Sequence, residues 1–299
     1  MTAATAPFGR VLTAMVTAFD DDGTVDLDGT AAIAKHLVDN GNDGLVVSGT
    51  TGEAPTTTTT EDGQILRTVL EAVGDRATVI AGVGTNNTAH SIELIEQAEK
   101  LGAHGALLVT PYYNKPTQDG ITAHFRAVAG ASGLPIMLYD IPGRTGVAIA
   151  PDTFKRVAED SRFVAVKDAV GDIYRGVQIM SQTGLTFYSG DDALNLAWLT
   201  HGAVGVVSVV GHVTGPEHAD MIAAIDRGDL TAALDIYRSL VPVIDVMMNR
   251  VQGAMTAKAA MQLLGVLPSR TMRLPLVPAD DEIVAALRAE LVALGRDVR

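Results

Sequence analysis

Cysteine is absent from this chain of 299 residues, and aromatic residues account for only 4% of it. Without cysteine the chain has no disulfide, no thiolate nucleophile and no cysteine-ligated metal site. Cations are also scarce, because 22 lysine and arginine residues stand against 35 acidic residues, for a formal net charge of −13. Nucleic acids and anionic membranes bind clustered cations, so we expect neither as a partner.

Long apolar runs are missing as well. No run reaches the roughly 20 residues that span a bilayer, and residues 1–7 lack the basic and apolar regions of a secretory signal. These two features predict a soluble, cytoplasmic protein. Apolar residues nevertheless make up 47% of the chain and charged residues 19%, a balance that supports a sizeable core and argues against disorder.

Short apolar runs rich in Val, Ile and Leu alternate with helical patterns along most of the chain, as parallel strands buried on both faces do. We predict strands at Val11–Phe19, Gly44–Val47, Thr78–Ala81, Gly105–Val109, Pro135–Tyr139, Phe163–Lys167, Leu185–Tyr188 and Val204–Val207. We predict helices between them at Leu27–Asp39, Glu61–Val73, Thr88–Leu101, Gln118–Ala131, Pro151–Ala158, Ile173–Gln182 and Asp192–Thr200. Thr58 and Glu61 fit a capping box at the start of the second helix.

Eight strands alternating with helices indicate an α/β fold of the (β/α)8 or TIM-barrel type, with an open doubly wound sheet as the structural alternative. The strand pattern stops near Gly215. Helices are predicted beyond it at Pro216–Asp226, Leu230–Met248, Ala254–Leu264 and Asp280–Leu294. We therefore expect a (β/α)8 barrel over residues 1–228 and a C-terminal helical region over residues 229–299 packed on it.

Polar residues follow several of the predicted strands, at the face where such barrels carry their active sites. Lys167 ends the sixth strand. It could be a structural lysine that snorkels to solvent or pairs with Asp168, or a desolvated amine with a lowered pKa that acts as a nucleophile. The strand alone leaves these two interpretations evenly balanced.

Two further strand ends carry hydroxyl groups. Thr50 and Thr51 lie in the turn Gly49–Glu53, which could form a nest for a small carboxylate or simply cap the next helix. Tyr112 and Tyr113 follow the fourth strand, where a tyrosine could transfer protons, form an interface or only pack.

The fifth and seventh strands complete the set. Tyr139 could be an acid–base group, and Arg144 stands on a Pro-Gly turn, where its planar fork suits a carboxylate. The acids of Ser189–Asp192 could hold a metal, although we favour a role in polarising a substrate or capping the next helix. Considered alone, Arg144 would be interpreted as a solvated loop residue.

Taken together, these motifs resemble the dihydrodipicolinate synthase family of the N-acetylneuraminate lyase superfamily. The resemblance covers nearly the whole chain, and it is specific because the motifs occur in the family's order. The segments that carry it are Gly49–Glu53, Pro111–Pro116, Tyr139–Gly146, Val166–Asp168 and Ser189–Asp192.

The resemblance implies a class I aldolase that condenses pyruvate with L-aspartate 4-semialdehyde on the diaminopimelate route to lysine, with no metal or organic cofactor. It implies an imine between pyruvate and Lys167. It also implies a proton relay formed by Thr50, Tyr139 and Tyr113. The pyruvate pocket would be formed by Thr51, Gly190 and Val207. Arg144 would bind the carboxylate of the semialdehyde. Tyr113 would reach in from a neighbouring subunit of a homotetramer built from two dimers.

Two alternatives to this synthase activity stay open at this point. One is a related pyruvate-dependent aldolase or lyase for sialic acid or a keto-deoxy-sugar acid, although such enzymes usually lack the Thr50–Thr51 pair and Arg144. The other is a non-catalytic barrel that binds a keto acid, which would not need the hydroxyl relay.

Two departures from the family pattern are visible. Asp140 stands where many members have asparagine, and we give this change little weight because the residue is a non-reacting neighbour. Members inhibited by lysine carry His and Glu in an allosteric site, whereas this chain has the threonine-rich segment Thr56–Asp62 and His90 there, with Tyr112 and Asn86 kept. We expect weak or absent inhibition by lysine.

Overall fold

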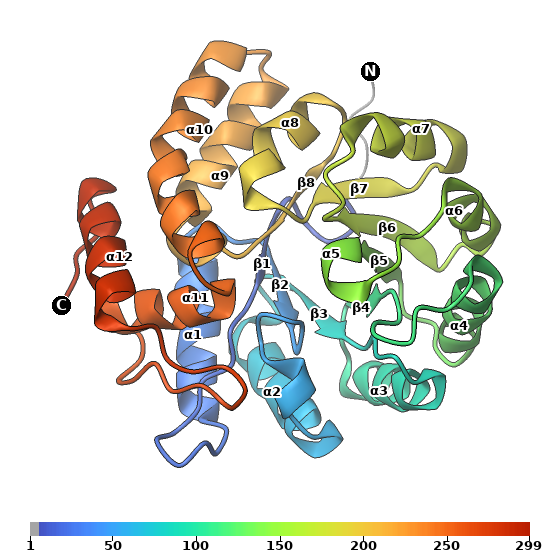
Figure 1. The fold of residues 1–299 in the computed structure, drawn as a ribbon, viewed down its shortest axis with the longest axis horizontal. Helices are drawn as coiled ribbons and strands as arrows, with labels where there is room; N and C mark the ends of the chain where they lie inside the picture. The colour runs from blue at the N-terminus through green and yellow to red at the C-terminus, as the bar shows by residue number, and fades with distance from the viewer. Residues whose placement is uncertain (1–5) are drawn as a thin grey trace.

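A computed structural model describes residues 6–299 and shows a closed barrel of eight parallel strands in chain order, ringed by helices (Figure 1). The predicted (β/α)8 barrel is confirmed, and the open sheet is excluded. The strands are β1 (Val11–Ala14), β2 (Gly44–Val47), β3 (Thr78–Gly82), β4 (Gly105–Val109), β5 (Ile136–Asp140), β6 (Phe163–Asp168), β7 (Thr186–Ser189) and β8 (Gly205–Ser208).

The helices lie between and after these strands. They are α1 (Leu27–Asp39), α2 (Thr59–Val73), α3 (Thr88–Leu101), α4 (Gln118–Gly130), α5 (Pro142–Thr145), α6 (Pro151–Ala158), α7 (Ile173–Thr183), α8 (Asn195–Thr200), α9 (Gly211–Asp226), α10 (Leu230–Ile244), α11 (Gly253–Leu263) and α12 (Asp281–Ala293). Short 3-10 turns η1 (Ala54–Thr56) and η2 (Asp192–Leu194) precede α2 and α8, and a π-helical turn η3 (Asp245–Asn249) follows α10.

Local sequence explains most helix boundaries. The predicted capping box of α2 is confirmed: the backbone amide of Thr58 donates to Glu61 Oε2 at 2.8 Å, and the amide of Glu61 donates back to the Thr58 hydroxyl. Helix α9 begins earlier than predicted, at Gly211, but its backbone is not helical at Thr214, two residues before Pro216. A proline ring inside a helix clashes with the carbonyl four residues before it and removes one amide donor, so a regular helix does not run through Pro216 and the chain is broken close to the predicted start.

The strands differ from prediction mainly at their ends. β1 is shorter than the predicted Val11–Phe19, because the chain leaves the sheet after Ala14 and Phe19 instead forms an isolated antiparallel bridge with Val25. β5 and β6 run one residue further than predicted, through Asp140 and Asp168. These two acids pair with each other in register across the two strands.

Side chains on β5 and β6 alternate between two cores. One core fills the barrel interior and includes Met137, Tyr139 and Ala165. The other lies between the barrel and its helices and includes Leu138 and Val166. Because alternate residues of a strand point to opposite faces, Tyr139 and Lys167 point inward, whereas Asp140 and Asp168 point towards the helices.

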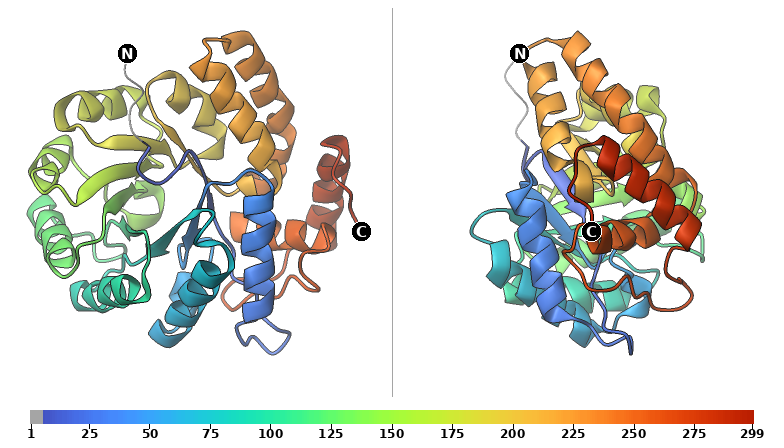
Figure 2. Two further views of the ribbon diagram at one scale, coloured as in Figure 1. Left: turned by 180° about the vertical axis from the view of Figure 1, so that it is seen from behind. Right: turned by 90° about the vertical axis from the view of Figure 1, so that its left-hand side faces the viewer.

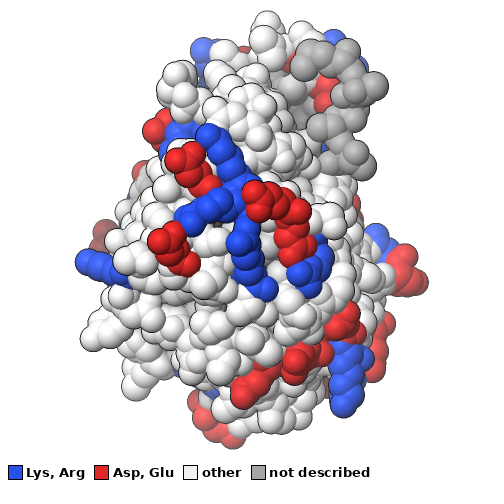
Figure 3. Space-filling view, turned by 90° about the vertical axis from the view of Figure 1, so that its right-hand side faces the viewer, with Lys and Arg blue, Asp and Glu red and all other residues white. Residues whose placement is uncertain are grey.

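The C-terminal helices form a group on one side of the barrel (Figure 2), where α10 and α11 contact α9. The division at residue 228 stays a prediction, and the first five residues of the predicted 1–228 region lie outside the described residues. The face over α4 and α6 (Figure 3) interleaves acids and bases, and its ion pairs join Arg126 to Glu159 and Arg156 to Asp119. Within residues 6–299, the helices are too short or too polar to cross a membrane.

Candidate active site

A cavity of about 480 Å³ opens where the second to fifth strands end. Its walls bring together four predicted site residues from separate parts of the chain, namely Thr50, Tyr113, Tyr139 and Arg144. They come from the turn after β2, the loop after β4, the end of β5 and the short helix α5. The prediction that polar strand ends meet at one face of the barrel is therefore confirmed for this set.

Lys167 lies beside Tyr139 inside the barrel. The two residues are direct partners in the β5–β6 register, and the Lys167 Nζ atom lies 4.3 Å from the centroid of the Tyr139 ring. Both side chains are nearly closed off from solvent, at 5% and 6% exposure. Lys167 is therefore neither a snorkelling lysine nor a partner of Asp168, whose side chain lies on the opposite face of β6.

Burial changes the protonation of this pair. Desolvation is the main cause that lowers the pKa of Lys167 to about 8; the Asp192 carboxylate opposes this shift and the Arg144 cation adds to it. Burial also raises the pKa of Tyr139 to about 12, which Arg144 partly offsets. An amine with this pKa is partly neutral near pH 8 and can act as a nucleophile, while the phenol stays protonated and can donate.

Gly190 packs directly on the reactive side chain. A Cβ atom at this position would lie 2.8 Å from Lys167 Cγ and 2.9 Å from the carbonyl oxygen of Asp168. Only glycine fits here without moving Lys167. Val207 on β8 is buried in the same interior core as Tyr139. It lies in the barrel interior rather than on the wall of the cavity.

The turn after β2 is closed by hydrogen bonds between its own backbone groups. The backbone amides of Gly52 and Ala54 donate to the carbonyl of Gly49 at 3.1 and 3.2 Å. These amides are used within the turn, which leaves Thr50 and Thr51 as its candidate donors to a carboxylate. Thr51 is buried, and Thr50 is partly exposed at the cavity.

The same turn is anchored by a buried ion pair that the sequence did not predict. Glu53 has a left-handed backbone with a φ of 58°, and its Oε1 atom accepts from Lys258 Nζ of α11 at 2.5 Å. Both side chains are almost fully buried. Burial lowers the pKa of Lys258 to about 8, and Glu53 opposes this shift. The C-terminal helical region thus holds the turn that carries Thr50 and Thr51.

Tyr113 and Arg144 lie at the rim of the cavity. Tyr113 is 88% exposed and has a φ of 73°, an uncommon conformation for a tyrosine. Within residues 6–299, no hydrogen bond joins its hydroxyl to that of Thr50 or Tyr139. Arg144 is exposed on α5, a helical turn that begins at Pro142, and it has no ion-pair partner in the described part of the chain. Arg144 is therefore a free cation at the mouth of the site.

The paired acids after β7 have different surroundings. Asp191 caps η2 by accepting from the Ala193 amide at 3.0 Å, as the capping interpretation predicts. Asp192 is buried and accepts from the amides of Val209 and Val210 at 2.9 and 3.0 Å. Its role is to join the end of β7 to the loop after β8.

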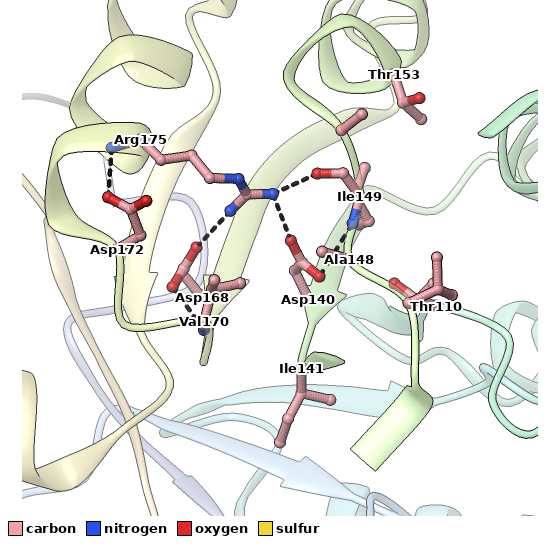
Figure 4. Close-up of polar contacts among 12 residues, drawn as sticks. Thr110, Asp140, Ile141, Ala148, Ile149, Thr153, Asp168, Val170, Asp172 and Arg175 are labelled. Atoms are coloured by element: carbon pink, nitrogen blue, oxygen red, sulfur yellow. Dashed lines mark hydrogen bonds and ion pairs between the residues drawn. The ribbon is translucent and has the colours of Figure 1, made fainter. Parts of the chain in front are cut away.

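Asp140 has more contacts than the sequence analysis assumed. It is fully buried and forms an ion pair with Arg175 of α7, which also approaches Asp168 (Figure 4). The sequence reasoning missed Arg175 because it lies on a helix rather than at a strand end. The only available signal was that Arg175 is the single charged residue of α7.

Comparison with known proteins agrees with this geometry. The model of the dihydrodipicolinate synthetase family matches residues 7–294. A curated protein of Acidothermus cellulolyticus named 4-hydroxy-tetrahydrodipicolinate synthase is 59% identical over 97% of this chain and 94% of its own. One of the same name from Kineococcus radiotolerans is 57% identical over 97% and 94%. The crystal structure of the Cyanidioschyzon merolae enzyme with lysine bound is 42% identical, with a TM-score of 0.94 over 97% of this chain and 99% of that one.

Proposed function

The chain belongs to the dihydrodipicolinate synthetase family, and we propose that Lys167 is the residue through which it performs the family's reaction. The protein is a lyase of the class I aldolase type, with 4-hydroxy-tetrahydrodipicolinate synthase activity. In this reaction pyruvate condenses with L-aspartate 4-semialdehyde on the diaminopimelate route to lysine. The observation that supports the role of Lys167 most strongly is its buried amine, held against the Tyr139 ring at the end of β6.

The first step is formation of an imine. The neutral amine of Lys167 attacks the ketone carbon of pyruvate, and loss of water leaves a cationic iminium on the lysine. This cation makes the neighbouring methyl group acidic, so loss of a proton gives an enamine. The lysine itself supplies the electron sink, and we therefore propose that neither a metal ion nor an organic cofactor takes part.

Hydroxyl groups move the protons in this proposal. The Tyr139 ring lies beside the lysine amine, and Tyr139 and Thr50 both line the cavity. Burial keeps the Tyr139 phenol protonated, so it donates to the departing hydroxyl group during loss of water. Thr50, with Tyr113 reaching in from a neighbouring subunit, then connects Tyr139 to solvent, while Thr51 binds the pyruvate carboxylate.

Arg144 receives the second substrate. Its exposed and unpaired guanidinium at the rim suits the carboxylate of the semialdehyde. The enamine carbon forms a bond to the aldehyde carbon, and the new alkoxide takes up a proton. The amine of the same substrate then attacks the imine carbon, which releases Lys167 as a free amine and closes the ring.

Substrate choice tests this assignment. Purified protein should consume pyruvate and L-aspartate 4-semialdehyde and form the cyclic product, and it should leave N-acetylneuraminate uncleaved. Cleavage of the sialic acid without use of the semialdehyde would favour the related lyase. Binding of pyruvate without turnover of either compound would favour a keto-acid-binding barrel.

The exposure of Tyr113 supports a role for this residue across a subunit interface. A tyrosine at 88% exposure with a left-handed backbone is directed away from its own subunit's core. We propose a homotetramer built from two dimers, in which Tyr113 completes the partner's relay.

We also propose that the protein is located in the cytoplasm, and cell fractionation checks this location.

A mixing experiment tests the shared site. Tyr113→Phe and Lys167→Met variants are each expected to lose activity. When the two are mixed and allowed to exchange subunits, sites with an intact Lys167 and an intact Tyr113 form, so activity should return. Failure to recover activity after demonstrated exchange would assign Tyr113 to its own subunit's site.

A further inference from the structure

A buried charge cluster lies directly behind the wall of the barrel that carries Tyr139 and Lys167. Its centre is Arg175, from the first turn of α7, whose side chain is 14% exposed (Figure 4). Its Nη2 atom lies 2.8 Å from Asp140 Oδ2, and its Nη1 atom lies 3.5 Å from Asp168 Oδ2. Both carboxylates are fully buried, so one guanidinium serves two acids from neighbouring strands.

The sheet register places this cluster one residue from the chemistry. Tyr139 pairs with Lys167, and the next residues, Asp140 and Asp168, pair with each other. Side chains alternate along a strand, so the first pair points into the barrel and the second points to Arg175. A shift of the acid pair would therefore move the reactive pair by a similar amount, because the two pairs share the same backbone.

Each acid also holds the chain that follows its strand. Asp140 Oδ1 accepts from the Ile149 amide at 3.2 Å, and Arg175 also donates to the Ile149 carbonyl. Asp168 Oδ1 accepts from the amides of Val170 and Gly171 at 2.9 and 3.3 Å. The cluster thus joins the ends of β5 and β6, the loop before α6 and the start of α7.

The position of Arg175 is set by close packing. The Asp172 carboxylate caps α7 by accepting from the Arg175 amide at 2.9 Å. At the next residue, Gly176, a Cβ atom would lie 2.1 Å from Trp198, so glycine lets α7 approach the barrel closely. The guanidinium also lies 5.7 Å from the Phe154 ring. Arg175 therefore enters the cluster from a fixed helix rather than from a mobile loop.

The balance of charge in the cluster makes the spacing of the ends of β5 and β6 depend on Arg175. Two acids face one cation, and burial raises the pKa of both acids, with that of Asp168 reaching about 6. Without Arg175, the carboxylates of Asp140 and Asp168 would face each other with no cation between them. Like charges in a poorly solvated site repel strongly, so the ends of β5 and β6 would separate or one acid would take up a proton.

We propose that Arg175 is a positioning residue for the reaction: by bridging Asp140 and Asp168 behind the barrel wall, it fixes the spacing of Tyr139 and Lys167 inside it. This inference rests on the proposed function of Lys167. The chain's own departure at Asp140 strengthens it, since asparagine there would leave only one acid for the arginine to hold. A buried ion pair adds little net stability, so a role in geometry accounts for the cluster better than stability does.

Three variants test the proposal, with kcat, both KM values and the rate of pyruvate trapping by borohydride as readouts. Arg175→Gln should lower kcat and slow trapping roughly 10- to 100-fold, because small misplacements of reacting groups cost that much. The KM for the semialdehyde should stay within about twofold of the wild-type value, a change much smaller than the loss of rate expected from a misplaced reacting group. Arg175→Lys keeps the charge and should retain part of the rate. The double variant Asp140→Asn with Arg175→Gln removes the repulsion and should regain part of the lost trapping rate.

Arg296→Gln is the matched control. Arg296 is also partly buried, at 24% exposure, and it binds Glu217 of α9, and neither residue lines the cavity. It should lower Tm and leave kcat unchanged. The proposal is overturned if Arg175→Gln lowers only Tm, or if Arg296→Gln lowers kcat equally. Wild-type protein that forms no pyruvate adduct would instead refute the proposed function, which keeps the two failures distinct.

Discussion

The Lys167 amine lies 4.3 Å from the centre of the Tyr139 ring, and the two residues face each other on adjacent strands. This arrangement places a buried amine beside the ring of a buried phenol. Burial lowers the pKa of the amine and raises that of the phenol, so nucleophile and acid coexist near neutral pH.

Imine formation should depend on pH through Lys167. With a pKa of about 8, the neutral amine fraction rises as pH increases through 8. At pH 7 it is roughly one-tenth, against roughly 0.03% for an unperturbed lysine. The rate of borohydride trapping with pyruvate, measured from pH 6 to pH 9, should increase and level off above about pH 8. A rate still increasing tenfold per pH unit at pH 9 would contradict the lowered pKa.

Arg144 should matter for the second substrate more than for the first. Arg144→Ala removes a charge-assisted contact worth about 1.5–3 kcal/mol, so kcat/KM for the semialdehyde should fall roughly 10- to 100-fold. Trapping of pyruvate should change much less and shift to higher pH, because the Arg144 cation helps to lower the pKa of Lys167. Steady-state kinetics and the trapping profile check both parts. Full activity of Arg144→Ala would show that another group binds the carboxylate.

Gly190→Ala should damage catalysis while the barrel stays folded. The new methyl group would meet Lys167 Cγ at 2.8 Å and displace the amine. We expect kcat to fall roughly 10- to 100-fold. Gly130→Ala at the end of α4 is a matched control, because a Cβ atom there meets nothing within 4 Å. Equal activity of the two variants would mean that the lysine adapts without cost.

Lysine should inhibit this enzyme weakly or not at all. Asp62 and His90 both line the cavity. His90 stands where lysine-sensitive relatives are expected to carry an acid, so the charges at this place differ from theirs. The Thr57 hydroxyl donates to Asp62 at 2.7 Å and His90 contacts Glu93, so both side chains already have partners. Half-maximal inhibition should need no less than about 1 mM lysine, the range of weak binding. Inhibition at micromolar lysine would contradict this prediction, and His90→Glu checks whether sensitivity can be introduced.

The helices were predicted well because their signals are local. Amphipathic spacing, the Thr58 cap and the glycines that follow α3 and α7 all belong to short stretches of sequence. The strand ends were less predictable. Asp140 and Asp168 look like loop residues in sequence. The pairing of β5 with β6 nevertheless continues through them, because Arg175 compensates their charges.

The site was predictable where it consists of strand-end motifs. The sequence identified Thr50, Tyr139 and Arg144, which the structure brings to one cavity. It did not identify the ion pairs behind the site, Arg175 with its two acids and Lys258 with Glu53, because their members are distant along the chain. A lone lysine in the apolar helix α11 was the only hint of the second pair. Such pairings depend on how helices dock against the barrel.

The most direct test of the account is where pyruvate becomes attached. Wild-type protein is incubated with pyruvate, reduced with borohydride and mapped by peptide mass spectrometry. Lys258 is an internal control, because its pKa is also lowered to about 8 but its amine is held by Glu53. The account predicts a reduced pyruvate adduct on Lys167 and none on Lys258. An unmodified Lys167, or an adduct at another lysine alone, would contradict it.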